Sequence, residues 1–174
     1  MSYFVGIDPG KNGGIAVLSN TNCVLVAAMP TNKENEIVFS ELVSLVSNAD
    51  FVVLEDVHSI FGMSAQSNFQ FGRGLGIIEG VLGALNKNYI KVSPKVWQKE
   101  IWADTTPIGN ATGKLLKSGQ PQIKIDTKAT SLIVAKKLFP NVNLLATKRS
   151  KVEHDGIVDA LLLAEYCRRK FKQQ

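Results

Sequence analysis

Four acidic residues occupy positions where a negative charge is costly unless something compensates it. Asp8 and Glu55 each end a short apolar segment, and Asp155 and Asp159 stand four residues apart where a long apolar stretch begins. On a helix, residues four apart share one face, so these last two carboxylates would lie one turn apart. Because a crowded or buried carboxylate needs a cation or hydrogen bonds, the pattern indicates a positive partner for the four acids.

Carboxylate oxygens without a Cys/His cluster are the ligands that Mg²⁺ and Mn²⁺ prefer. Sets of carboxylates can hold two such ions about 4 Å apart for phosphodiester hydrolysis. One ion then lowers the pKa of the attacking water, and the other stabilises the leaving oxygen. The four acids therefore suggest a site for two Mg²⁺ ions, with Mn²⁺ as a substitute.

Each acid also has a simpler interpretation. Asp8 could be a turn-former before Pro9-Gly10, and Glu55 could be a strand-end residue that leans into solvent, with Asp56 as a rival acid. Asp155 is a good N-cap residue, and Asp159 would lie near the positive end of the helix dipole. Against this, Ala160 to Ala164 are all apolar, which predicts that the helix carrying the pair is largely buried.

The charge of the chain is unevenly distributed. The net charge is +5, but residues 1–84 hold three basic and eight acidic residues, whereas residues 85–174 hold seventeen basic and seven acidic ones. A basic half favours a polyanionic partner, most often nucleic acid, over a merely lysine-rich surface.

The 174 residues suit a single domain, 1–174. No apolar run reaches the roughly 20 residues of a membrane span, so no membrane association is expected, and the first residues do not resemble a signal peptide. Cys23 and Cys167 lack CxxC spacing and are interpreted as reduced thiols. We expect a cytoplasmic or nucleoid-associated protein, in a phage or viral host cell or an organelle matrix, that is not secreted.

The elements that must position the acids follow from the hydrophobic pattern. Short apolar runs joined by turns predict antiparallel strands, and longer periodic runs predict helices. The expected strands are 3–8, 14–18, 23–28, 51–55 and 89–92, and the expected helices are 36–46, 64–85, 126–138 and 155–171. Residues 103–122 lack periodicity and predict a long flexible loop. The order indicates an α/β fold with a mixed five-stranded sheet flanked by helices, in which three antiparallel strands precede parallel additions.

Three motifs in this order resemble the RuvC-like Holliday-junction resolvases, most closely the compact phage, poxvirus and organellar type. They are Gly6-Ile-Asp-Pro-Gly10 with Gly13-Gly14, Leu54-Glu-Asp-Val57, and His154-Asp-Gly-Ile-Val-Asp159-Ala-Leu161. The resemblance spans residues 3 to about 169. It implies a ribonuclease H-like fold and a homodimer that resolves four-way junctions by paired symmetric incisions, with metal-activated water as the nucleophile. It also implies that Asp8, Glu55, Asp155 and Asp159 are the catalytic metal ligands.

One departure from the family concerns the last two acids. Bacterial relatives usually place them three residues apart, and here that position is Gly156, which cannot be a ligand. The four-residue spacing leaves Glu153 or His154 as substitutes for Asp155. His154 could equally be a solvated helix cap.

The resemblance also implies DNA contacts. Lysines near the family's active site act at the phosphate, and Lys99 and Lys128 are the nearest positions, with Lys95 as a rival for Lys99. Lys11 and Arg73 are the further basic contacts that we predict. Aromatic residues after the second acidic strand would wedge into the opened junction, and Phe61 is the candidate, with core packing as its alternative.

The helix after Glu55 is rich in glycine, which weakens a helix interior by about 1 kcal/mol per residue relative to alanine. Gly76 and Gly80 share a face. They could allow close contact with a second copy of the chain, as in the family's dimers, or with the protein's own sheet.

Three other functions have some support in the sequence. A nuclease for RNA or RNA–DNA hybrids would keep the same fold and site, and a non-catalytic junction-binding module would use the acids only as caps. A phosphate-binding domain of the actin-like ATPase type needs about twice this length.

Overall fold

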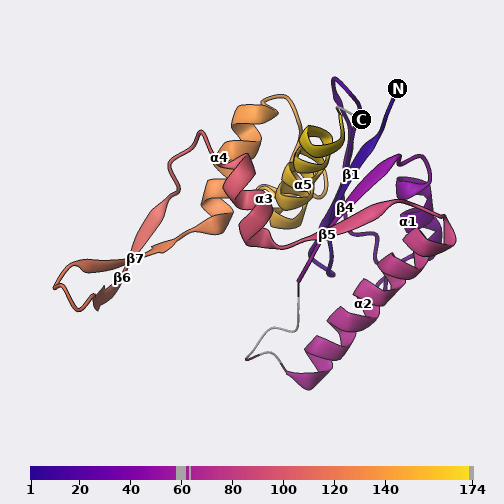
Figure 1. Cartoon of the computed structure of the whole chain (residues 1–174). Coiled ribbons are helices and arrows are strands. Elements are labelled where there is room, and N and C mark those ends of the chain that lie inside the picture. Colours follow the sequence, from indigo (N-terminus) through magenta and orange to yellow (C-terminus); the bar gives the residue numbers. More distant parts are fainter. Residues whose placement is uncertain (58–61, 63, 173–174) are drawn as a thin grey trace.

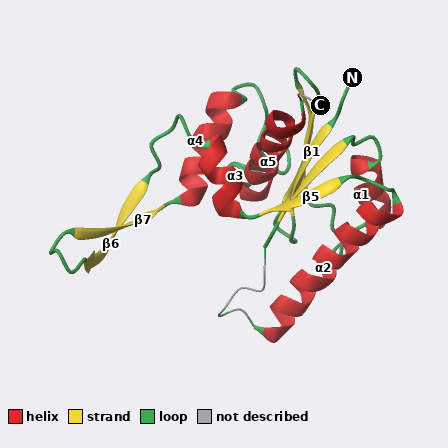
Figure 2. Ribbon diagram, viewed as in Figure 1, coloured by secondary structure: helices red, strands yellow, loops and turns green. Residues whose placement is uncertain are grey.

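The centre of the molecule is a five-stranded mixed sheet, in a computed structural model that describes residues 1–57, 62 and 64–172 (Figures 1 and 2). The strand order is β3-β2-β1-β4-β5. The strands are β1 (Phe4–Asp8), β2 (Gly14–Leu18), β3 (Cys23–Ala28), β4 (Phe51–Glu55) and β5 (Tyr89–Val92). The first three pair antiparallel, β4 pairs parallel with β1, and β5 pairs parallel with β4. The predicted α/β architecture is confirmed.

Helices cover both faces of this sheet (Figure 2). They are α1 (Phe39–Val46), α2 (Ala65–Ala84), α3 (Pro94–Ile101), α4 (Thr127–Leu138) and α5 (Asp155–Phe171). Alternate residues of β1 enter two separate hydrophobic cores: Phe4 packs with α3, α4 and α5, whereas Val5 and Ile7 pack with α1 and α2. Among the described residues, no helix has both the length and the apolar character that crossing a membrane requires.

Helix α5 lies directly on β1 and β2, and glycine permits the close approach. A Cβ atom at Gly6 would overlap the backbone of α5 at Ala160 and Ala164. A Cβ at Gly14 would overlap the backbone of Gly156 at the start of the same helix. The buried run from Ile157 to Cys167, interrupted only by half-buried Asp159, therefore packs against the two central strands. The last helix of the chain thus reaches the strand that ends at Asp8.

Replacing Gly6 by alanine should destabilise the protein, because the new methyl group would meet rigid backbone rather than a movable side chain. Overpacking of this kind typically lowers the free energy of unfolding by about 1–3 kcal/mol. Gly83→Ala on α2 is the matched control: its Cβ would meet no atom of the described residues within 4 Å, so up to about 1 kcal/mol of stabilisation is expected. Urea unfolding of both variants measures the difference, and equal stability would contradict this close packing.

One predicted helix boundary is wrong by three residues, and one helix was not predicted. The helix expected from residue 36 begins at Phe39, because Ile37 forms a bridge with Thr31 and the Val38 amide donates to the Pro30 carbonyl. Helix α3 carries Pro94 in its first turn and buries Trp97 and Ile101, which lie four residues apart.

Residues 103–122 are not the structureless loop that their composition predicts. They contain β6 (Gly109–Leu115), which pairs antiparallel with β7 (Pro121–Ile125) in a separate two-stranded sheet. Gly113 and Gly119 have φ values of 76° and 82°, a region that glycine enters readily. Neither strand has a buried face. The hydrophobic alternation that normally reveals a strand is therefore weak.

Candidate active site

Asp8 and Glu55 emerge at the same edge of the sheet. The parallel pairing of β1 with β4 sets Ile7 opposite Leu54, so the next residue of each strand is one of these acids. A tight turn follows Asp8, closed by the Gly13 amide donating to the Gly10 carbonyl at 3.0 Å. The carboxyl ends of parallel strands are where open α/β sheets place their sites.

Helix α5 brings the other two acids to this edge. Its second residue, Gly156, lies so close to the turn after β1 that a Cβ there would overlap the backbone of Asn12 and Gly13. Asp155 and Asp159 therefore begin the helix beside the end of β1. The structure thus brings together the four acids that the sequence singled out, and each of the other three acts electrostatically on Asp8.

The electrostatic state of the site reflects burial and crowding of like charges. Burial, followed by the charges of Glu55, Asp159 and Asp155, raises the pKa of Asp8 well above its ordinary value. Burial is also the main reason that the pKa of Glu55 rises to about 7 and that of Asp159 to about 6. Such raised values mark a place where negative charge lacks enough compensation, which is the condition that a bound cation relieves.

Trp97 on α3 holds Glu55 in place, and sequence reasoning missed it. Its indole N–H donates to the Glu55 Oε1 atom at 2.9 Å, and both side chains are buried. This hydrogen bond lowers the pKa of Glu55 and so offsets part of the rise caused by burial. A buried tryptophan needs a partner for its N–H, so the signal was present, but the partner is 42 residues away in the chain.

Lys128, near the start of α4, forms an ion pair with Asp155. The pKa of Lys128 is raised, first by the hydrogen bond to Asp155 and then by the charges of Asp155 and Asp159. Lys128, which the sequence analysis placed near the active site, therefore contacts one of the four acids.

The proposed substitutes for Asp155 have other roles. His154, not Asp155, is the N-cap of α5, and its Nδ1 atom accepts from the Ile157 amide at 3.3 Å. Glu153 forms an ion pair with Lys136 on α4. The interpretation of Asp155 as the helix cap is therefore wrong, since Asp155 is the first residue inside the helix.

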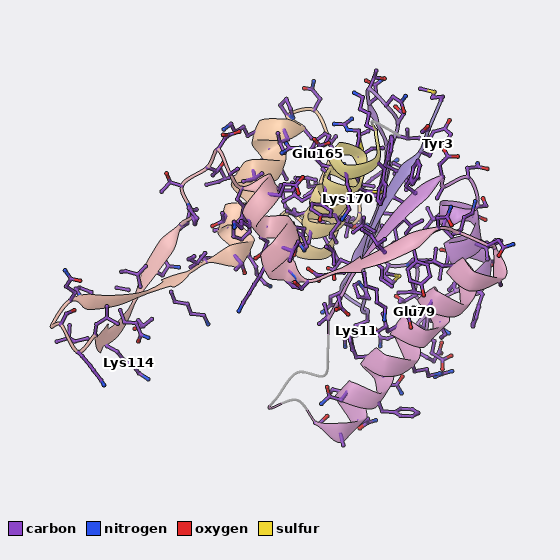
Figure 3. All side chains as sticks on the ribbon, viewed as in Figure 1. Tyr3, Lys11, Glu79, Lys114, Glu165 and Lys170 are labelled. Carbon is purple, nitrogen blue, oxygen red and sulfur yellow. The ribbon has the colours of Figure 1, made fainter. Side chains whose placement is uncertain are left out.

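The remaining predicted contacts lie at several places. Exposed Lys11 belongs to the turn after β1, at the sheet edge that carries the acids (Figure 3). Lys95 and Lys99 are exposed on α3, the helix that supplies Trp97. Arg73 on α2 forms an ion pair with Glu36 at 2.7 Å, which is a role that the sequence did not indicate. Phe61 lies outside the described residues.

The oxygen donors of the four acids fit a hard divalent cation, although the side chains in their present positions do not form a complete coordination site. No group of three or more His, Cys, Asp or Glu side chains in the described part of the chain is arranged so that it could hold a metal ion. Two of the carboxylates are turned to protein donors, Glu55 to Trp97 and Asp155 to Lys128. Oxygen-only donors with uncompensated charge nevertheless match the preference of Mg²⁺. Binding an ion would require these side chains to reorient.

The metal-free protein should become less stable as pH rises from about 4 to about 7. Glu55 and Asp159 hold protons more tightly in the folded state, with pKa values near 7 and 6 against ordinary values of 4.5 and 3.8. Their contribution to stability is therefore complete below about pH 4 and is lost as pH rises through the folded-state values. Thermal unfolding in chelator should show this fall, and Asp159→Asn should make it shallower. A midpoint that rises over this range in both proteins would contradict the assignment.

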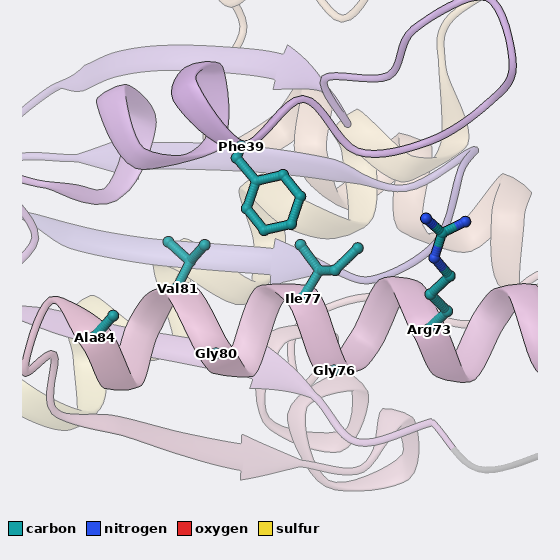
Figure 4. A pocket seen from close by; sticks show the side chains of 7 residues that line it. All are labelled: Phe39, Arg73, Gly76, Ile77, Gly80, Val81 and Ala84. Carbon is teal, nitrogen blue, oxygen red and sulfur yellow. The ribbon is translucent and has the colours of Figure 1, made fainter.

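A separate surface groove runs along the glycine-rich helix. It is lined by Phe39 from α1 and by residues of α2, namely Arg73, Gly76, Ile77, Gly80, Val81 and Ala84 (Figure 4). Within the part of the chain that the structure describes, a Cβ at Gly76 or Gly80 would meet nothing within 4 Å. Close packing onto the protein's own sheet is therefore not the reason for these two glycines.

The fold is similar to solved structures of RuvC. One, described as Thermus thermophilus RuvC in complex with a Holliday junction substrate, has a TM-score of 0.61 and 13% identity, over 98% of this chain and 97% of that chain. A second Thermus thermophilus RuvC structure has a TM-score of 0.59 and 14% identity, over 95% of each chain. This likeness shows the fold, which is the ribonuclease H-like fold of RuvC. No protein-family model and no curated protein matches the chain.

Proposed function

We propose that the chain is a divalent-metal-dependent, structure-selective DNA endonuclease that resolves four-way junctions by paired symmetric incisions. The observation that carries this proposal is the convergence of Asp8, Glu55, Asp155 and Asp159 at one sheet edge, where burial and mutual repulsion raise the pKa of three of them. The basic second half of the chain and the junction substrate of the similar RuvC structure support it. The three sequence motifs favour the compact phage, poxvirus or organellar type, acting in the cytoplasm or on nucleoid DNA.

In this proposal the four acids hold two Mg²⁺ ions, which when bound supply an activated water and stabilise the leaving oxygen. Trp97 keeps Glu55 at the sheet edge through its indole N–H. Lys128 reaches the acids on an exposed, flexible side chain, so it can exchange Asp155 for a phosphate oxygen of the substrate. Lys11 and the exposed lysines of α3 contribute further positive charge for the DNA backbone.

Symmetric incision needs two sites, and we propose that a second copy of the chain supplies the other. The groove along α2 offers apolar side chains around Gly76 and Gly80, which leave room for a second helix. In a twofold dimer the same groove would meet itself, as a closed symmetric interface requires. Each protomer would then present one acidic site to one strand of the junction.

The test is cleavage of a synthetic mobile four-way junction compared with a linear duplex of the same sequence, with Mg²⁺ and with chelator. We expect paired incisions in strands of like polarity, with 5′-phosphate and 3′-hydroxyl ends, only in the junction and only with metal. Equal cutting of both substrates, or cutting in chelator, would contradict the proposal. An RNA–DNA hybrid included in the panel separates the alternative nuclease activity, because that activity would cut the hybrid and spare the junction.

A further inference from the structure

The β6–β7 hairpin extends away from the body of the molecule (Figure 1). Every residue of both strands is exposed. An isolated two-stranded hairpin is marginally stable in water at best, since it lacks a surface to pack on. Its exposed position therefore indicates that something outside this chain covers it when the protein works.

The two faces of the hairpin differ in chemistry. The pairing of Ala111 with Ile123 and of Gly109 with Ile125 places these side chains on one face, which is apolar. Ile123 and Ile125 are 58% and 48% exposed there. The opposite face is polar: Asn110 pairs with Lys124, and the Thr112 hydroxyl donates to the Gln122 amide oxygen at 3.2 Å.

All charged residues of the hairpin are positively charged lysines. Lys114, Lys117 and Lys124 lie between Asp104 and Asp126, and no acidic residue lies in that interval. Lys114 projects near the far end of the hairpin (Figure 3). A second copy of the same surface would be repelled by this charge, whereas a polyanion would be attracted to it.

The root of the hairpin is tied to the acidic site. Asp126, which directly follows β7, caps α4 by accepting from the Ala129 amide, and its own amide donates to the Ile108 carbonyl. The Ile108 amide donates in turn to the Thr130 hydroxyl on α4. Lys128, in the same turn of α4, pairs with Asp155. A ligand held along the hairpin would therefore run toward the carboxylates.

We infer that this hairpin is a DNA-binding ribbon that lies in the major groove of a duplex arm next to the cleaved strand, an inference that rests on the proposed function. The major groove of B-DNA is wide enough to admit a two-stranded β-ribbon. The lysines contact the phosphates that border the groove, and the apolar face contacts base edges, where the methyl group of thymine is the natural apolar partner. The hairpin thereby fixes the direction in which an arm leaves the site.

The experiment compares two double variants with equal loss of charge. Lys114→Gln with Lys124→Gln alters the hairpin, and Lys170→Gln with Lys172→Gln alters exposed residues at the far end of α5 from Asp155. Binding of a fluorescent linear duplex is measured by anisotropy in chelator over a series of salt concentrations. The slope of log affinity against log salt concentration is negative, and each lost phosphate contact reduces its magnitude by about 0.9. The magnitude should therefore decrease by roughly 2 for the hairpin variant and should not change for the control.

Equal slopes for the two double variants would overturn the inference, as would failure of the unaltered protein to bind duplex. Because chelator prevents metal-dependent cutting, this result does not depend on catalysis. If the salt dependence of duplex binding changes in the hairpin variant but the unaltered protein never cuts junctions, the DNA-binding role of the hairpin is supported and the proposed function is overturned. If the protein cuts junctions normally but the hairpin lysines do not affect the salt dependence of duplex binding, the proposed function is supported and the DNA-binding role of the hairpin is overturned.

Discussion

Replacing Asp8 by asparagine should abolish junction incision while junction binding remains. Asp8 is the acid on which all three others act, and its carboxylate ends the central strand of the sheet. In the proposed function Asp8 holds a metal ion, and loss of such a charged ligand removes several kcal/mol of transition-state stabilisation, which corresponds to a rate decrease on the order of 10³-fold or more. The amide is nearly the same size as the carboxyl group, so the fold and the basic DNA contacts should be unchanged.

Single-turnover cleavage and gel-shift binding of the same junction measure the two effects of Asp8→Asn separately. At pH values above 7, removing one of several crowded negative charges should also raise the midpoint temperature of unfolding of the metal-free protein, because the pKa of Asp8 is raised in the folded state. Glu41→Gln, an exposed acid on α1, is the control and should leave incision, binding and stability unchanged. Normal incision by Asp8→Asn would show that the chemistry lies elsewhere.

Placing glutamine at Gly76 and Gly80 together should convert the proposed dimer into a monomer and eliminate the proposed paired incision. No described residue lies within 4 Å of either Cβ position, so the longer side chains can be accommodated in the isolated protomer. Glutamine is also a much better helix former than glycine, so the protomer should gain up to about 1 kcal/mol per site. A second helix packed on the groove would instead meet two new side chains and be displaced.

Sedimentation measures the mass of this variant and urea unfolding measures its stability. Gly83→Gln is the control, because Gly83 also has open space but does not line the groove. We expect the double variant to be a stable monomer that nicks a junction without coordinated cutting of the second strand. A stable dimer with unchanged paired incision would place the interface on another surface.

The sequence alone predicted the local structure that prepares the site. Apolar runs ending in Asp8 and Glu55 indicated two strands, and the four-residue spacing of Asp155 and Asp159 indicated one helical face. These inferences held because strands and a helix that are buried along most of their length leave continuous apolar runs in the sequence, and burial raises the pKa of three of the four acids at the ends of those runs. The same reasoning failed for residues 103–122, since a hairpin with no buried face needs no such apolar run.

Only the tertiary structure decided how these pieces meet. The hydrogen bond from Trp97 to Glu55 and the ion pair of Lys128 with Asp155 join residues that are 42 and 27 positions apart. Gly6 and Gly14 allow α5 to lie on the sheet, which a sequence of elements does not reveal. Helix α5 likewise brings Asp155 and Asp159, from the basic half of the chain, close to Asp8 of the acidic half. Local periodicity reports which side chains are buried, but the partners of a buried group depend on long-range packing, which has no period along the chain.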